Sequence, residues 1–134
     1  MSRLHLIFGL LLFVAFVVTG QYMLADFPDK DVIPADLRLL MRSRHIYIFF
    51  DAMIHIALGL YLVLRPRLWQ WLLQIGGSVL LVVSGLLLLY SWYTETYKTG
   101  HFSRLSALGI FAALGGVGFH LIGGFSVRKG LPEV

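Results

Sequence analysis

The sequence predicts an all-α membrane protein, built as an up-down bundle of four transmembrane helices with a short interfacial helix after the first. Hydrophobic residues make up 58% of the 134 residues, and charged residues only 13%. A soluble domain usually carries about 25% charged residues, and the mean hydropathy of +0.81 points the same way. The apolar residues also gather into four stretches, each near the roughly 20 residues that a spanning helix needs.

Each of the four stretches predicts a helix, because the hydrocarbon core offers no water to satisfy exposed backbone groups. The expected bounds are about 4–24, 44–64, 68–92 and 105–125, which together form one domain over residues 1–134. The first stretch follows a short basic segment and resembles a secretory signal peptide. It is long enough to cross a bilayer, so we interpret it as an uncleaved first helix.

The connections between the stretches predict the topology. Pro34 suits the first turn of a helix, and Leu37 and Leu40 share a face against arginines, which predicts an amphipathic interfacial helix at about 34–42. The Arg-Pro-Arg turn at 65–67 breaks the helical hydrogen bonds and predicts a hairpin. An even number of spans places both termini on one side, and this arginine-dense turn favours the cytoplasmic side. The chain has the character of a bacterial inner-membrane protein.

Composition excludes several function classes. The chain has no cysteine, which excludes disulfides, thiolate metal sites, thiol redox chemistry and covalent haem attachment. The basic residues lie between apolar runs rather than in one patch, so we expect no nucleic-acid partner. No phosphate-binding loop, helical zinc-protease motif or nucleophile turn occurs. Whether the protein is an enzyme is left open.

Small and polar residues recur on one face of each apolar segment. In lipid, such faces let helices approach closely, and we expect these stripes to be mainly packing surfaces. The stripe of the fourth segment also holds a histidine, and that of the first is mostly apolar. The faces comprise His5, Gly9, Leu12, Phe16 and Thr19; Ala52, His55 and Gly59; Gln70, Gln74, Gly77, Ser84 and Ser91; and Gly109, Ala113, Gly116, His120 and Gly124.

A depth count predicts a buried polar layer. At about 1.5 Å per residue in a core about 30 Å thick, His55, Gln74 and His120 lie roughly 18, 20 and 24 Å from the surface that holds the first and third connections. Asp51 precedes His55 by four residues and lies one turn above this layer. Ionisable residues at membrane depth are costly, so this pair in the second segment indicates a functional site.

The layer allows four interpretations. His55 and His120 would serve as the axial ligands of haem b, with Gln74 beside it and Gly116 making room for the macrocycle. Asp51, His55 and His120 would instead form a nitrogen and oxygen ligand set for zinc or iron. The same groups would form a proton or substrate pathway. In the simplest alternative, they are hydrogen bonds that fix helix register.

A second group of residues gathers at the surface of the first and third connections. Arg42, Arg44, His45 and Tyr22 place donors at the headgroup level, where they would hold a lipid headgroup or the ring of a quinone. A plain anchor to anionic lipid is the alternative.

Three hypotheses for the function follow. The first is a redox or electron-transfer component that binds haem b or interacts with a quinone. The second is an accessory or assembly subunit of a larger membrane complex. The third is an oligomeric transporter of protons or a small molecule that uses Asp51. A bundle this small leaves glycine-bearing faces for a second copy or a partner.

Overall fold

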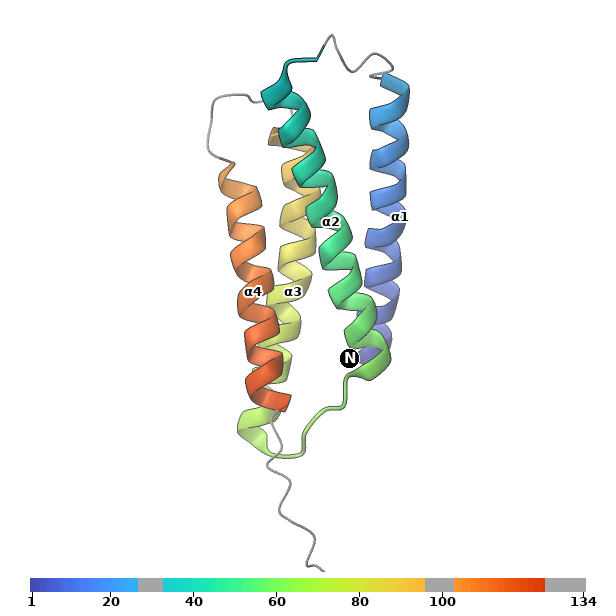
Figure 1. The fold of residues 1–134 in the computed structure, drawn as a ribbon. Helices are drawn as coiled ribbons and strands as arrows, with labels where there is room; N and C mark the ends of the chain where they lie inside the picture. Colours follow the sequence, from blue (N-terminus) through green and yellow to red (C-terminus); the bar gives the residue numbers. More distant parts are fainter. Residues whose placement is uncertain (27–32, 96–102, 125–134) are drawn as a thin grey trace, which may run out of the picture.

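The structure, a computed structural model, describes residues 1–26, 33–95 and 103–124. Within these residues the chain is all helical and has no strand, as predicted. The helices are α1 (Ser2–Asp26), α2 (Ala35–Tyr61), α3 (Leu68–Glu95) and α4 (Arg104–Gly124). Consecutive helices run in opposite directions along a common axis (Figure 1). The beginning of α1 and the end of α4 lie toward the same end of the molecule.

The structure does not confirm a separate interfacial helix at about 34–42. One continuous helix, α2, replaces it, because no glycine or proline interrupts the chain between Pro34 and Gly59. The C-terminal end of α2 lies before residue 64, where the sequence predicted it, because the backbone of Leu62 is already extended at φ −67° and ψ 117°. The predicted end of the fourth helix, near residue 125, falls one residue outside the described chain.

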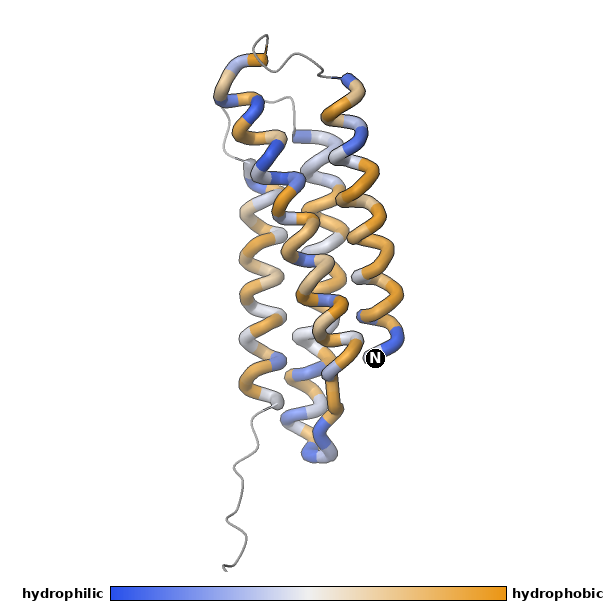
Figure 2. The backbone as a smooth tube through the Cα atoms, turned by 45° about the vertical axis from the view of Figure 1, so that its right-hand side comes forward, coloured by the Kyte–Doolittle hydropathy of each residue, from blue (hydrophilic) through white to orange (hydrophobic). Residues whose placement is uncertain are grey.

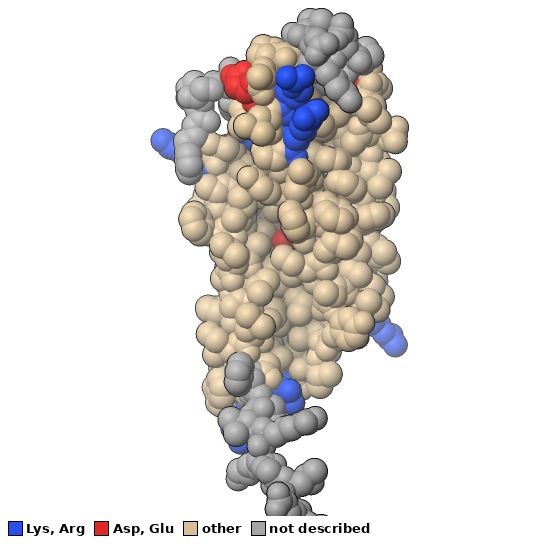
Figure 3. Space-filling view, viewed as in Figure 1, with Lys and Arg blue, Asp and Glu red and all other residues tan. Residues whose placement is uncertain are grey.

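Three of the described helices, α1, α3 and α4, are long and apolar enough to cross a membrane. Their apolar side chains point outward: Leu10 is 50% exposed, Phe111 70% and Leu121 65%. Hydrophobic residues run along the helices in Figure 2, and charged side chains gather toward the two ends on the face shown in Figure 3. This pattern is that of a helical membrane protein.

The four helices pack as two pairs. Helices α1 and α2 form one close pair, α3 and α4 form the other, and α2 contacts α3 between them. Glycines bring each pair together: a Cβ added to Gly9 would lie 2.8 Å from the backbone nitrogen of Ile56, and one added to Gly77 would lie 2.8 Å from the carbonyl oxygen of Gly116. These contacts confirm that the small residues form packing surfaces.

Gly116 and Gly118 offer a matched test of this packing. A Cβ at Gly116 would lie 2.7 Å from Cγ of Leu81, whereas one at Gly118 would meet no described heavy atom within 4 Å. We expect Gly116→Ala to lower the free energy of unfolding by about 1–3 kcal/mol through overpacking, and Gly118→Ala to leave it unchanged or raised. Thermal melts of both variants in one detergent would measure this. Equal melting temperatures would contradict the assigned α3–α4 contact.

The predicted interior faces are largely confirmed. All the polar and small residues expected on one face of α3 are buried, and His55, His120 and Asp51 are buried as well. His5, on the mostly apolar face of α1, is also fully buried. The bundle therefore encloses several polar groups along its axis, which a hydrocarbon environment tolerates only where they find partners.

Candidate functional site

Four residues, one from each helix, form a hydrogen-bonded chain inside the bundle. His5 Nδ1 lies 2.8 Å from His55 Nδ1, and His5 Nε2 lies 2.8 Å from Ser78 Oγ. Ser78 Oγ lies 3.2 Å from His120 Nε2. We call His5, His55, Ser78 and His120 the histidine network. It joins His55 to His120, which the sequence placed at similar depth, but through two residues that the prediction of the layer did not include.

Gln74 lies next to the network and serves the neighbouring turn. Its side-chain oxygen accepts from the backbone nitrogen of Arg65 at 2.9 Å, and its side-chain nitrogen donates to the carbonyl of Val63 at 3.1 Å. Its backbone carbonyl accepts from Ser78 Oγ at 2.9 Å. Gln74 therefore fixes the connection between α2 and α3 and orients Ser78, while its amide forms no hydrogen bond to a histidine within the described residues.

Asp51 lies one turn from His55 on α2 and is 1% exposed. Ser84 Oγ donates to its Oδ1 at 3.1 Å, and its Oδ2 lies 3.8 Å from His55 Nε2. Gly85 makes the room for this carboxyl group, because a Cβ there would lie 2.7 Å from Oδ2. Asp51 is thus placed at one end of the histidine network, just beyond hydrogen-bond distance.

The hydrogen bonds of Ser78 determine where the hydrogens of the network lie. Its hydroxyl has one hydrogen, which it donates to the carbonyl of Gln74. His5 Nε2 and His120 Nε2 must then both donate to Ser78 Oγ. Neutral His5 accepts at Nδ1, so His55 Nδ1 is the donor between the two rings. In the neutral network, one ring nitrogen at each end carries no hydrogen. These nitrogens are His55 Nε2 and His120 Nδ1.

The two ring nitrogens that carry no hydrogen in this assignment are also the ones without a hydrogen-bond partner in the described structure. Among the described residues, His55 Nε2, His120 Nδ1 and Asp51 Oδ2 are buried side-chain atoms without a hydrogen-bond partner. Two of them, Asp51 Oδ2 and His55 Nε2, face each other. The 3.8 Å between them is just beyond hydrogen-bond distance. Every polar side chain in the middle of the network has a hydrogen-bond partner.

A cavity of about 470 Å³ lies beside the other end of the network. His120 lines it, and Nδ1 is the ring nitrogen of His120 that Ser78 does not engage. Arg65 also lines it and donates to the carbonyl of Gly124 at 3.1 Å. We call this the α2–α4 cavity. Its lining is Ile54, Ala57, Leu58, Tyr61, Leu62, Val63, Arg65, Gln74, Val117, His120, Leu121 and Gly124.

An apolar layer separates Asp51 from the opposite end of the bundle. Ile48 lies one turn from Asp51 on α2 and Leu88 one turn from Ser84 on α3, and both are almost fully buried. Beyond this layer, Arg44 Nη1 donates to the backbone carbonyl of Glu95. The described side chains therefore form a polar path on one side of Asp51 and an apolar barrier on the other.

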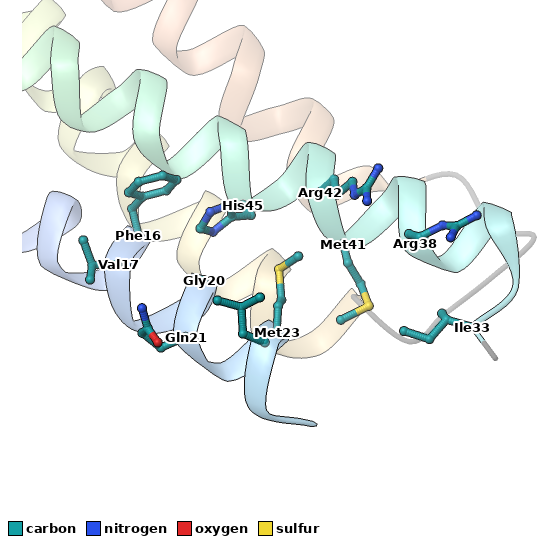
Figure 4. A pocket seen from close by; sticks show the side chains of 11 residues that line it. Phe16, Val17, Gly20, Gln21, Met23, Ile33, Arg38, Met41, Arg42 and His45 are labelled. Carbon is teal, nitrogen blue, oxygen red and sulfur yellow. The ribbon is translucent and has the colours of Figure 1, made fainter. Parts of the chain in front are cut away.

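The four residues predicted to hold a headgroup lie in three different surroundings. Arg42 and His45 line a second cavity, of about 420 Å³, between α1 and α2. Arg44 is 2% exposed and points toward α3. Tyr22 lies edge-on to Trp92, with the ring centroids 5.5 Å apart. We call the second cavity the α1–α2 cavity. Its lining is Phe16, Val17, Gly20, Gln21, Met23, Leu24, Ile33, Arg38, Met41, Arg42 and His45 (Figure 4).

The predicted haem and metal ligands occupy a different arrangement here. The ring of His5 lies 4.8 Å from that of His55 and 5.8 Å from that of His120, measured between centroids. Gly116, expected to make room for a macrocycle, instead packs against Gly77 and Leu81. Within the described ranges, no three His, Asp or Glu side chains are grouped to hold a metal ion. The haem and metal assignments stay predictions.

The fold and the site define a helical membrane bundle with a buried histidine network. Comparison of the chain with protein-family models, curated proteins and solved structures finds no match. The function must therefore be argued from the site. Two of its members, His5 and Ser78, were absent from the predicted layer; the spacing of His5, Gly9 and Leu12, which places them on one helical face, was the signal that pointed to His5.

Proposed function

We propose that the protein is a four-span membrane protein that transfers protons through its histidine network. The observation that carries the proposal is the hydrogen-bonded chain from His55 through His5 and Ser78 to His120, with Asp51 Oδ2 3.8 Å from its His55 end. Histidine is suited to this role, because its neutral ring both donates and accepts a hydrogen. A network that served only packing would not need a titratable group at nearly every position.

In this proposal α2 is the fourth span. It has 27 residues and packs between α1 and α3. Arg44, Asp51 and His55 reduce its hydropathy, but all three are buried inside the bundle. Lipid would contact residues such as Phe50 and Leu60, which are 60% and 61% exposed. The polar side chains thus do not prevent α2 from crossing the bilayer.

The first transfer follows from the positions of the hydrogens. Once the two side chains have closed the 3.8 Å gap to hydrogen-bond length, a proton on Asp51 Oδ2 moves to His55 Nε2, which carries no hydrogen. It leaves a carboxylate, which Ser84 continues to hydrogen-bond. The His55 cation then passes its Nδ1 hydrogen to His5 Nδ1 across 2.8 Å. His55 is neutral again, and His5 carries the charge. One proton has moved from α2 to α1. Asp51 is now negatively charged, His5 is positively charged, and the other groups of the network are neutral.

The second transfer requires Ser78 to turn. While Ser78 donates to Gln74, it receives hydrogens from both rings and passes none on. His120 takes part when its hydrogen is on Nδ1. Ser78 then receives the Nε2 hydrogen of His5 and gives its own to His120 Nε2. His120 releases its Nδ1 proton toward the α2–α4 cavity, so one proton enters the network and one leaves it.

A full crossing also requires the apolar layer of Ile48 and Leu88 to open on the other side of Asp51. In the proposed cycle, this layer blocks the path between turnovers. It prevents the network from conducting as a permanently open channel, which would dissipate the membrane's proton gradient.

Liposome flux measurements test the proposal. Purified protein is reconstituted with a pH-sensitive dye inside the vesicles, and a potassium gradient with valinomycin sets the membrane potential. We expect potential-driven proton uptake above that of empty liposomes, with a reversal potential that follows the pH gradient. Uptake equal to that of empty liposomes, from protein shown to be helical and inserted, would contradict proton transfer.

The other hypotheses stay predictions with their own tests. Haem b ligation by His55 and His120 predicts a Soret band in protein expressed with adequate haem, and the band would be lost in His120→Ala. An accessory role predicts co-purification with a larger complex under mild solubilisation. The proton proposal is preferred because it accounts for His5 and Ser78, which neither alternative requires.

A further inference from the structure

We propose that the α1–α2 cavity binds an acidic membrane amphiphile, with its anionic head at Arg38 and Arg42 and its acyl chain against Phe16 and Val17. All four residues line the cavity, which has a volume of about 420 Å³. This size falls within the range of about 300–1,000 Å³ typical of ligand pockets. The site is separate from the histidine network, so the inference is independent of the proposed proton transfer.

Polarity changes along the cavity in one direction. Arg38 and Arg42 are one turn apart on α2, and His45 follows three residues deeper into the bundle. Figure 4 shows both arginines on α2 at one end of the cavity and Phe16 beside His45 at the other. An amphiphile with a charged head, a polar linker and an apolar chain has the same order of chemistry.

Charge favours an anionic head over a neutral one. Among the residues that the structure describes, the lining contains two arginines and a histidine but no aspartate or glutamate. Arginine binds phosphate and carboxylate groups with paired, directed hydrogen bonds. A neutral quinone ring would leave this positive charge without an opposite charge in the ligand.

Hydrogen bonding and ring stacking hold His45 where the polar linker of the ligand would lie. Thr19 Oγ1 donates its one hydrogen to the carbonyl of Phe16 at 2.9 Å, so His45 Nδ1 must donate to Thr19 Oγ1, also at 2.9 Å. The His45 ring stacks on Phe16 with centroids 4.1 Å apart. Gly20 leaves space for the ring edge, since a Cβ there would lie 3.1 Å from Cε1 and 3.5 Å from Nε2. Neutral His45 thus presents Nε2 as an acceptor for a hydroxyl group.

Acidic phospholipids and free fatty acids share the anionic head and the acyl chain, and only the phospholipid adds a polar linker between them. The test measures binding to delipidated, full-length protein in detergent by native mass spectrometry, with thermal shift as a second readout. The probes are dioleoyl phosphatidylglycerol, dioleoyl phosphatidylcholine, oleate and a short-chain ubiquinone. We expect phosphatidylglycerol, oleate or both to bind at least about fivefold more tightly than phosphatidylcholine, which corresponds to about 1 kcal/mol.

Three variants connect binding to the cavity. We expect Arg42→Gln to remove most of the preference for acidic probes, and Val17→Trp to weaken every probe by filling the apolar end. Arg104→Gln is the matched control: it removes another exposed arginine from the same end of the bundle, outside the described lining of the cavity. Melting temperatures close to that of the wild type would show that each variant is folded.

Each outcome bears on the proposal. Preference for phosphatidylglycerol alone assigns the ligand as a phospholipid, and preference for oleate alone assigns it as a fatty acid. Equal binding of phosphatidylcholine, tighter binding of the quinone, or an equal loss in Arg104→Gln would overturn the proposal. So would full binding to folded Val17→Trp, because the chain would then lie elsewhere.

Discussion

Asp51→Asn is expected to reduce potential-driven proton flux by about tenfold or more, because positioned proton donors contribute factors of this size or larger. The amide cannot donate a proton to His55 Nε2 in the way that a carboxylic acid does. Its oxygen still accepts from Ser84, which lies 3.1 Å from Asp51 Oδ1. The side chain keeps nearly the same volume beside Gly85. The variant should therefore fold with little change in melting temperature.

Asp36→Asn is the matched control for this experiment. Asp36 is also on α2 but is exposed, in the first turn of the helix. Its replacement makes the same chemical change, from carboxyl to amide, without reaching the histidine network. Flux in liposomes should be that of the wild type. If Asp51→Asn conducted protons at the wild-type rate, Asp51 would not be the entry point and the proposed first transfer would be wrong.

Ser78→Ala is expected to stop flux and also to destabilise the bundle. The substitution removes the oxygen that accepts from both His5 Nε2 and His120 Nε2. An unsatisfied buried donor costs about 1–3 kcal/mol, so the free energy of unfolding should fall by at least about 1 kcal/mol. Liposome flux and thermal melts measure the two effects. Nitrogen-15 NMR of the histidine rings should also show a changed tautomer distribution in the variant.

Ser43→Ala separates these effects from the loss of an ordinary serine. Ser43 Oγ donates to the carbonyl of Leu40 at 3.0 Å, much as Ser78 donates to Gln74, but it has no hydrogen bond to a histidine in the described structure. We expect unchanged flux and unchanged ring tautomers. In the wild type, NMR should find hydrogens on His5 Nε2, His55 Nδ1 and His120 Nε2. Hydrogens on the opposite nitrogens of His5 and His120 would refute the assigned role of Ser78.

The sequence allowed the helices and their inward faces to be predicted, because both follow from local periodicity. Gln70, Gln74 and Ser84 recur at helical spacing, and the structure buries all three. The position of Asp51 above His55 also followed from a spacing of four residues. The boundary of α2 was wrong for a local reason, since an amphipathic segment and a spanning segment join without a helix breaker.

Contacts between helices were harder to predict, because they depend on how each helix is rotated and which helices are neighbours. His5 lay in a mostly apolar stripe, and nothing local showed that it would meet three other helices. Arg42 and Arg44 were assigned to one site, yet residues two apart point to nearly opposite sides of a helix. One lines a cavity with α1, and the other reaches the carbonyl of Glu95.

The pairing of the helices has a consequence for motion. The close contacts of glycines with backbone atoms lie within the pairs, at Gly9 in one and at Gly77 in the other, whereas Gly85 of α3 approaches only side chains of the other pair. The bonds between the pairs are different in kind: His5 to Ser78 and Ser84 to Asp51 are side-chain hydrogen bonds. Such bonds average about 0.6 kcal/mol each in membranes. Each pair should therefore move as a stiff unit, and the two units should hinge against each other at the surface where the histidines meet.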